Sequence, residues 1–318
     1  MSVSILGAGA FGTALAVALA RDGTPVTLFA RSGAEAMQAS RENSVRLPGV
    51  TLPASLLVEA SLDIAARADI VLLAVPMQQL AAFVGTNKSL LQRKTLVACC
   101  KGIDLSRGQG PVRLLRDLCP DANVAILTGP SFAADIASGL PTALTLACAD
   151  PEIGSGLQST LSTAELRLYL SDDMIGAELG GALKNVIALA AGLTIGAGHG
   201  ESARAALITR GFAEMQRFAR HAGARPETLS GLSGFGDLIL TATSEKSRNY
   251  AAGLAVGRGE ALPNATTEGI ATAKAVVRLA EANGLDMPIA SAVAAVFDGQ
   301  RSVADVTEAL LRRPLKRE

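Results

Sequence analysis

The chain has few aromatic residues and no excess of charge of either sign, and both shortages argue against a nucleic-acid partner. Tryptophan is absent, and aromatic residues make up 3% of the 318 residues. Stacking platforms for single-stranded nucleic acid are therefore not expected. Twenty-nine basic residues balance twenty-nine acidic residues, whereas a nucleic-acid surface needs an excess of Lys and Arg.

Cysteine and histidine are too scarce and too scattered to indicate a metal site or a disulfide framework. The chain contains two histidines and four cysteines, none of them in a CxxC pair: Cys99, Cys100, Cys119 and Cys148. A zinc site needs such ligands at characteristic spacings. We expect no metal, and buried thiols that stay reduced in a cytoplasmic protein.

Uncharged runs are present, but none has the features of a signal peptide or a membrane span. Residues 1–20 carry no charge and end in Ala18-Leu19-Ala20, yet no basic residue precedes Arg21, as a signal peptide would require. The uncharged run 185–200 is interrupted by Gly192, Gly196 and Gly198 and is shorter than the ~20 residues of a membrane span. We expect no membrane span and interpret this run as a buried helix.

The length and the apolar pattern predict two domains, because single cores stop growing near ~250 residues. Predicted strands in the first half are 2–6, 26–30, 69–75, 95–100, 123–127 and 143–147. Continuous apolar strands are typical of a parallel sheet covered by helices on both faces. We therefore expect an α/β domain with a doubly wound open sheet, which binds ligands at the carboxyl ends of its strands.

The second half has a different character. Predicted helices, rich in Ala and Leu, are 172–196, 203–222, 267–283 and 291–298. No strand pattern as strong as those of the first half follows residue 170. We expect the α/β domain to cover 1–175 and an all-α, substrate-binding domain to cover 176–318.

A glycine-rich turn follows the first predicted strand and opens a helix: Gly7-Ala8-Gly9-Ala10-Phe11-Gly12. The spacing GxGxxG in this context is the dinucleotide-binding fingerprint of the Rossmann fold. Gly7 would form the tight turn, Gly9 would let a pyrophosphate approach the backbone, and Gly12 would let helix and strand pack closely. The alternative is a glycine-rich loop that only packs.

The end of the second predicted strand bears on the choice of cofactor. An acidic residue there would bind the adenosine ribose hydroxyls and favour NAD, but the chain has Arg31. A guanidinium pairs well with a 2′-phosphate, so NADP is favoured. A solvated surface arginine is the alternative.

Two further segments follow predicted strands and should lie beside the ligand crevice. Lys101-Gly102 follows the strand 95–100, and Gly129-Pro130-Ser131-Phe132-Ala133 follows the strand 123–127. Lys184 lies on an apolar helix that we expect to be buried, where desolvation would lower the pKa of the amine and suit it to proton transfer. A lysine that snorkels near a helix end is the alternative.

Polar residues in the helical half complete the candidate chemistry. Asp237 lies between a glycine-rich turn and an apolar run; it is either a helix N-cap or a carboxylate that orients a lysine or a substrate hydroxyl. Ser247-Arg248-Asn249 offers a hydroxyl, a guanidinium and an amide together. This combination suits a phosphate group, and a solvated helix face is the alternative.

These segments resemble the bacterial form of the NAD(P)-dependent glycerol-3-phosphate dehydrogenase family. The matching stretches run in the family's order from residue 7 to residue 269: GAGAFGTALA, LFAR, VLLAVP, KGI, TGPSFA, ELGGALKNVIALAAG, AALITRGFAEM, GLSGFGDLILTATS, SRNY and TEG. GGALKNVIA followed by GDLILT and SRN is far more specific than the glycine fingerprint alone.

The resemblance implies reversible reduction of dihydroxyacetone phosphate to sn-glycerol 3-phosphate for phospholipid synthesis, with NADP or NAD. It also implies a Rossmann domain and an all-helical domain of the 6-phosphogluconate dehydrogenase-like type. The site would lie between them, usually in a homodimer.

Residue by residue, Lys184 matches the family's proton donor and acceptor, and Lys101 a lysine that contacts both substrate and cofactor. Other implied substrate contacts are Gly129, Ser131, Asp237, Thr241, Ser247, Arg248 and Asn249. Beside the glycine loop with Ala10 and Phe11, the implied cofactor contacts are Arg31, Lys101, Ala133, Arg248 and Glu268. Phe11 stands where many members have Trp.

Other interpretations stay open from the residues alone. A dehydrogenase for a hydroxy or keto acid would share this architecture and a helix-borne lysine. A non-catalytic NADP-binding regulator would keep the glycine loop without needing Lys101, Lys184 and Asp237 together. We interpret His199, within Gly198-His199-Gly200, as a turn residue rather than a catalytic base.

Overall fold

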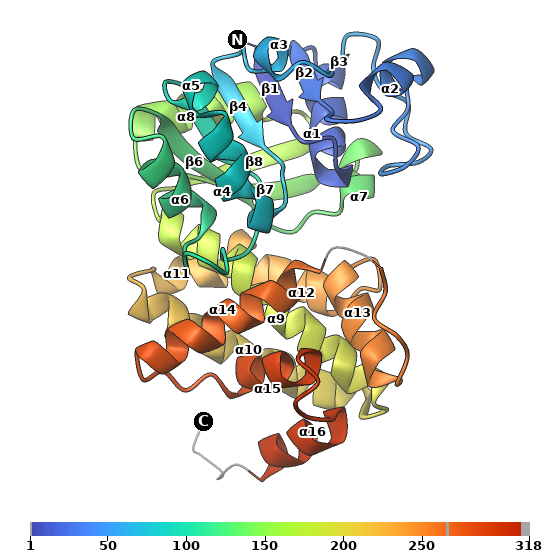
Figure 1. The fold of residues 1–318 in the computed structure, drawn as a ribbon, viewed down its shortest axis with the longest axis vertical. Helices are drawn as coiled ribbons and strands as arrows, with labels where there is room; N and C mark the ends of the chain where they lie inside the picture. Colours follow the sequence, from blue (N-terminus) through green and yellow to red (C-terminus); the bar gives the residue numbers. More distant parts are fainter. Residues whose placement is uncertain (1, 265–266, 313–318) are drawn as a thin grey trace.

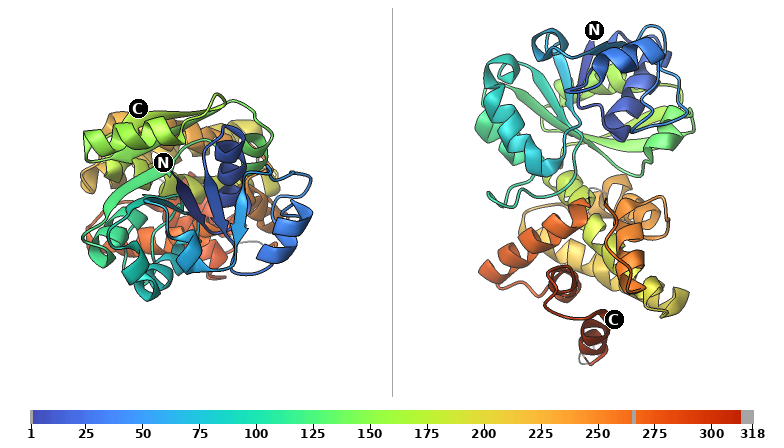
Figure 2. Two further views of the ribbon diagram at one scale, coloured as in Figure 1. Left: turned by 90° about the horizontal axis from the view of Figure 1, so that it is seen from above. Right: turned by 45° about the vertical axis from the view of Figure 1, so that its right-hand side comes forward.

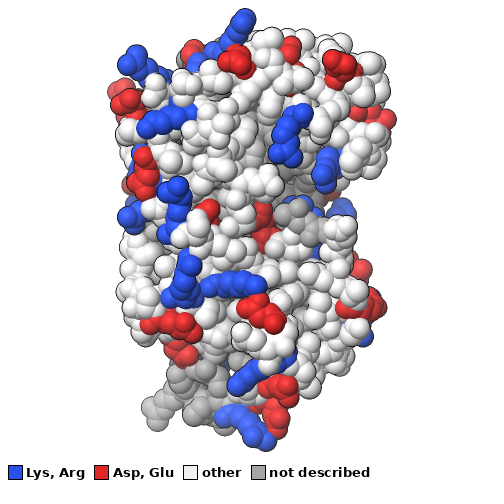
Figure 3. Space-filling view, viewed as in Figure 1, with Lys and Arg blue, Asp and Glu red and all other residues white. Residues whose placement is uncertain are grey.

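The computed structural model describes residues 2–264 and 267–312, and the ends of the two expected domains, Met1 and 313–318, lie outside the described residues. Within this range an α/β part and a helical part lie end to end, joined across one junction (Figures 1 and 2). Lys and Arg alternate with Asp and Glu on the face shown in Figure 3, so that face carries no large patch of a single sign.

An eight-stranded sheet forms the α/β part, in the order β3-β2-β1-β4-β5-β6-β7-β8. The strands are β1 Val3–Leu6, β2 Val26–Phe29, β3 Leu57–Glu59, β4 Ile70–Leu73, β5 Thr95–Ala98, β6 Asn123–Thr128, β7 Thr142–Cys148 and β8 Leu166–Ser171. The six predicted strands are confirmed, with ends that differ by a few residues at most. The doubly wound α/β sheet followed by helices confirms the expected fold class.

The expectation of a parallel sheet is wrong at one position, because β6 and β7 are antiparallel. β8 then pairs in parallel with β7, so this pair runs opposite to the other six strands. Apolar runs reveal that a strand is buried but not its direction. β3 and β8 were not predicted, because β3 has three residues and β8 alternates buried and exposed residues at the sheet edge.

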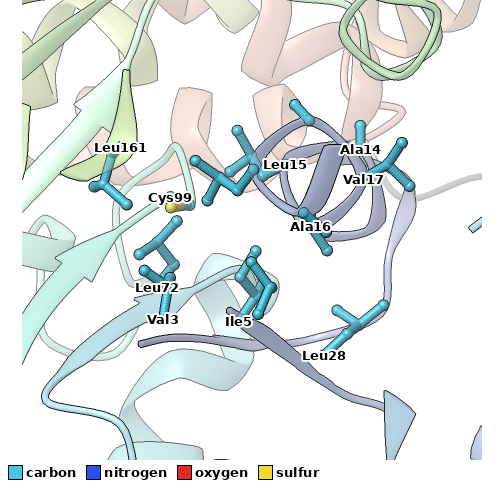
Figure 4. Packing of buried hydrophobic residues seen from close by; sticks show 14 of the residues in the cluster. Val3, Ile5, Ala14, Leu15, Ala16, Val17, Leu28, Leu72, Cys99 and Leu161 are labelled. Atoms are coloured by element: carbon cyan, nitrogen blue, oxygen red, sulfur yellow. The ribbon is translucent and has the colours of Figure 1, made fainter. Parts of the chain in front are cut away.

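Helices cover both faces of the sheet: α1 Ala10–Arg21, α2 Ala34–Ser40, α3 Leu62–Ala65, α4 Met77–Thr86, α5 Lys88–Leu91, α6 Pro111–Leu118, α7 Ala133–Ala137 and α8 Pro151–Leu161. Figure 4 shows side chains of α1, such as Leu15, gathered over strand residues including Ile5 and Leu72. A second apolar cluster, with α4 and α6, lies among strands and helices of this part and also includes Met174 and Ala177, which follow β8. All four cysteines are buried and free, as expected.

The helical part is built around the long helix α9, Met174–Gly196. Around it lie α10 Gly200–His221, α11 Pro226–Ser230, the π-helix η1 Leu232–Gly236, α12 Asp237–Ala242, α13 Arg248–Gly257, α14 Glu268–Ala282, α15 Pro288–Phe297 and α16 Val303–Leu311. The four long helices predicted there are confirmed within a few residues. By length and composition α9 would be able to cross a membrane, but 89% of its most apolar window is buried inside the protein.

Candidate active site

The glycine loop has the geometry that each glycine position requires. Gly7 has φ of +123°, and a Cβ there would lie 2.6 Å from the carbonyl oxygen of Ala74. A Cβ on Gly12 would lie 2.1 Å from the carbonyl oxygen of Gly7, whereas one on Gly9 would meet nothing within 4 Å. The loop is therefore closed on its sheet side and open above Gly9.

The first turn of α1 leaves backbone donors near this open face. The first helical hydrogen bond runs from the Thr13 N–H to the Gly9 carbonyl, 2.9 Å apart. The N–H groups of Ala10, Phe11 and Gly12 precede it and have no partner inside the helix. Together with the positive end of the helix dipole, these donors give the start of α1 the features that favour binding of a phosphate group.

Arg31 lies where the sequence predicted, just after β2 and beside the glycine loop. The Gly7 N–H donates to the Phe29 carbonyl at 3.3 Å, which joins the loop to the end of this strand. Arg31 is exposed. Arg31 is therefore accessible to solvent just past the strand end that the glycine loop contacts.

Where the two parts meet, two lysines form ion pairs with the same carboxylate. Asp237, the first residue of α12, is buried and 1% exposed. Its Oδ2 atom lies 2.5 Å from the Nζ atom of Lys101, and its Oδ1 atom lies 3.0 Å from the Nζ atom of Lys184. Lys101 follows β5, whereas Lys184 lies within α9. The side chain of Asp237 thus orients lysines from both parts of the molecule rather than capping its own helix.

The lysines of this cluster repel each other, and the carboxylate offsets part of that repulsion. Burial lowers the pKa of Lys184, Asp237 raises it, and Lys101 and Arg248 lower it, so that the resulting pKa is about 8. Burial would raise the pKa of Asp237, but Lys101 and Lys184 together hold it below its ordinary value. Asp237 is therefore a stable anion, and Lys184 changes its charge near neutral pH.

Hydroxyl and carbonyl groups complete the cluster. Lys184 donates a hydrogen bond to the Thr241 hydroxyl, which in turn donates to Asp237 Oδ1 at 3.2 Å. Lys101 donates to the Gly129 carbonyl at 3.0 Å, and the Ser131 hydroxyl donates to the same carbonyl at 3.2 Å. Lys184 is 7% exposed and points inward, which excludes the snorkelling interpretation.

Within Ser247-Arg248-Asn249, Arg248 is exposed, whereas Ser247 and Asn249 make hydrogen bonds inside the protein. Ser247 is the N-cap of α13 and accepts the Tyr250 N–H. The amide of Asn249 donates to Asn185 at 3.0 Å and accepts the N–H of Gly269 at 3.0 Å. Arg248 is exposed, and its charge acts on both Lys184 and Glu268. The sequence did not indicate the bonds of Asn249, because its partners are distant along the chain.

Glu268 joins the helical part to the sheet. Its Oε1 atom accepts the N–H of Met77, the first residue of α4, at 3.3 Å. Burial raises the pKa of its carboxyl group, and the Met77 N–H and Arg248 oppose that shift. Ala133 begins α7 and packs against the sheet core. Ala133 follows β6, and the Met77 partner of Glu268 follows β4.

Two other expectations concern histidine and metals. His199 is exposed and precedes α10 in the turn after α9, as predicted. In the ranges 2–264 and 267–312, no group of three or more His, Cys, Asp and Glu side chains is arranged to hold a metal ion.

Comparisons with known proteins agree with this geometry in both parts of the chain. Residues 2–154 match the family described as NAD-dependent glycerol-3-phosphate dehydrogenase N-terminus, and residues 173–308 match its C-terminus. Glycerol-3-phosphate dehydrogenase [NAD(P)+] of Ruegeria sp. is 58% identical over 321 residues, and that of Roseobacter denitrificans is 59% identical. Each alignment covers 100% of this chain and 100% of the relative.

A solved structure shows the same similarity in three dimensions. The crystal structure of glycerol-3-phosphate dehydrogenase from Coxiella burnetii superposes with a TM-score of 0.94 at 33% identity. The match covers 98% of this chain and 99% of that one. Since the matches extend through both the glycine loop and the two-lysine cluster, this chain belongs to the NAD-dependent glycerol-3-phosphate dehydrogenase family.

Proposed function

We propose that this protein reversibly reduces dihydroxyacetone phosphate to sn-glycerol 3-phosphate, using NADPH or NADH. The observation that carries the proposal is the buried cluster Lys101–Asp237–Lys184 at the carboxyl ends of the strands. Relatives that match the whole chain are named glycerol-3-phosphate dehydrogenase [NAD(P)+]. In a bacterial cell this product is a precursor of membrane phospholipids, and we propose that role here.

The cluster supplies what the reduction of a ketone needs. The ketone oxygen gains negative charge in the transition state, and the Lys184 ammonium is placed to stabilise that charge and to donate a proton. Asp237 holds the Lys184 Nζ atom at 3.0 Å. Lys101 adds a positive electrostatic field, and its repulsion helps keep the pKa of Lys184 at about 8. In glycerol phosphate oxidation, neutral Lys184 accepts the proton.

The substrate phosphate requires a cation away from the reacting carbon. We assign this role to Arg248, which is exposed at the first turn of α13. Ser247 and Asn249 hold the start of that helix in place and complete the anchor, while Thr241, Gly129 and Ser131 surround the lysines. Binding energy from the phosphate helps to orient the carbonyl beside Lys184.

The residues present fit a nicotinamide dinucleotide. The open face at Gly9 and the free donors of Ala10, Phe11 and Gly12 suit its pyrophosphate. When bound, the cofactor gives or takes the hydride. Additional proposed contacts are Gly7, Arg31, Lys101, Ala133, Arg248 and Glu268. Because Arg31 replaces an acid at the end of β2, we propose that NADPH binds better than NADH.

Domain limits, assembly and location are also proposals. We place the boundary between 1–175 and 176–318, since the last strand ends at Ser171 and α9 begins at Met174. We propose a homodimer in the cytoplasm. Light scattering of the purified protein tests the assembly state, and a mass of one chain would refute the dimer.

The function is tested by comparing substrates at saturating NADPH. We expect rapid oxidation of NADPH with dihydroxyacetone phosphate, and far slower oxidation with dihydroxyacetone, which lacks the phosphate. Small keto acids are the second comparison. Turnover of a keto acid in preference to the ketone phosphate would overturn the proposal, as would NADPH binding without turnover of any ketone.

A further inference from the structure

A glycine on α9, Gly181, lies beside Lys101 and Lys184. Gly181 lies three residues before Lys184, so both project from the same face of the helix. A Cβ at Gly181 would lie 2.6 Å from the Thr128 hydroxyl oxygen and 3.4 Å from the Cγ atom of Lys101. The end of β6 and the stem of Lys101 therefore cross α9 where the helix has no side chain.

At this contact between β6 and α9, the Thr128 side chain acts through packing rather than through a hydrogen bond. It is the last residue of β6 and is fully buried. Its hydroxyl has no hydrogen-bond partner within the described part of the chain. A β-branched side chain has few rotamers, and the sheet fixes its backbone. Directly after it, Gly129 turns the chain at φ of +139° and presents the carbonyl that accepts Lys101.

We propose that Gly181 and Thr128 are positioning residues that set the separation of Lys101 and Lys184 across Asp237. This inference rests on the proposed function of those lysines. Thr128 is fixed by the sheet and Gly181 by the helix, so their contact fixes how closely β6 and α9 approach. Each lysine then reaches one oxygen of the same carboxylate, at 2.5 Å and 3.0 Å.

The first test is Gly181→Ala. Alanine favours the helix by ~1 kcal/mol, so a loss of activity would not come from weaker helix formation. The added methyl must displace Thr128, and with it the adjacent Gly129 carbonyl that holds Lys101. We expect kcat to fall on the order of 100-fold, the usual effect of a displacement of ~1 Å. The KM for NADPH should stay unchanged.

Two double variants distinguish a steric clash with Thr128 from a general disruption of the protein. Gly181→Ala with Thr128→Ala removes the atom that the methyl meets, and we expect kcat to recover to within about tenfold of the parent protein. Gly181→Ala with Thr128→Val keeps a branched side chain, and its kcat should stay at the level of the single variant. Gly156→Ala on α8 is the control, because a Cβ there meets nothing within 4 Å.

A measurement without substrate keeps this inference separate from the proposed function. Trace labelling with acetic anhydride, followed by peptide mass spectrometry, reports the pH at which the Lys184 amine loses its proton. In Gly181→Ala we expect this pH to rise, because Lys101 moves away and repels Lys184 less. If Gly181→Ala lowers the melting temperature but leaves the titration of Lys184 unchanged, the role of Gly181 is merely structural and the inference is overturned.

The remaining outcomes are also decisive. A Gly181→Ala variant whose kcat is within threefold of the parent protein refutes the inference. Equal kcat values for the two double variants also refute it. If the parent protein fails to reduce dihydroxyacetone phosphate while the Lys184 titration shifts as expected, the proposed function fails and the positioning role stands.

Discussion

Opposing influences determine the charge of Lys184. Burial, Lys101 and Arg248 favour the neutral amine, whereas Asp237 favours the ammonium, and the resulting pKa is about 8. A fully exposed lysine would stay charged throughout the neutral range and would be a poor proton donor. The position of Lys184 on an apolar helix predicted a low pKa, but only the structure identifies Asp237 and Thr241 as its partners.

Lys184→Ala removes the proton donor and should leave the cofactor site intact. We expect kcat for reduction of dihydroxyacetone phosphate to fall by on the order of 10³-fold, within the usual range for loss of a general acid. The Kd for NADPH, measured by fluorescence titration, should not change. A variant that keeps near-normal turnover would contradict the assignment.

Arg248→Ala should act mainly on the substrate. Loss of a charge-assisted contact with phosphate corresponds to a rise of about 10- to 100-fold in the KM for dihydroxyacetone phosphate. Arg258, exposed just after the end of the same helix, provides a matched control as Arg258→Ala. Steady-state kinetics on both variants test this assignment, and equal substrate KM values would count against it.

Arg31→Ala tests the cofactor preference, with NADH as the internal control. Removing the guanidinium at the end of β2 should raise the KM for NADPH much more than the KM for NADH, because only NADPH carries the 2′-phosphate. The ratio of the two KM values is the readout. Equal increases for both cofactors would refute a role in phosphate recognition.

Among the elements, those with continuous apolar runs were predictable, and those shaped by their neighbours were not. The strand β4 and the helix α9 match their predicted ranges closely. The π-helix Leu232–Gly236 was not predicted, because it depends on contact with the chain before it and with α9. A Cβ on Gly234 would lie 2.0 Å from the Leu229 carbonyl, and one on Gly180 would lie 2.6 Å from the Ser233 carbonyl.

A buried glutamate joins two helices and makes stability depend on pH. Glu214 of α10 accepts the N–H groups of Ile289 and Ala290 at the start of α15. Burial nonetheless raises its pKa from 4.5 to about 7. The folded protein therefore holds an extra proton between these values, and the free energy of unfolding falls as pH rises through that interval.

Glu214→Gln should flatten this dependence. Between pH 4.5 and 7, Glu214 changes the free energy of unfolding by on the order of 3 kcal/mol. Burial also raises the pKa of Glu178 to about 7, and its contribution to the pH dependence remains in the variant. Denaturant unfolding at several pH values between 4.5 and 7 measures the slope. Glu227→Gln at an exposed position is the control. A slope unchanged by Glu214→Gln would contradict the account.

At the scale of the whole molecule, the site exists only where the two parts meet. Lys101 reaches Asp237, Met77 donates to Glu268, and Lys246 pairs with Asp135 at 3.3 Å across the same junction. The sequence predicted the two parts and the chemistry of each, because periodicity and motifs are local. It did not predict these bonds, since their partners are more than 100 residues apart and depend on how the parts pack.

The most direct test of the central claim is the pH dependence of kcat in both directions, for the reaction of dihydroxyacetone phosphate with NADPH and its reverse. Reduction needs the Lys184 ammonium, so its kcat should fall as pH rises through about 8. Oxidation of glycerol phosphate needs the neutral amine, so its kcat should rise through the same pH. Profiles that are flat, or that change in the same direction, would contradict proton transfer by Lys184.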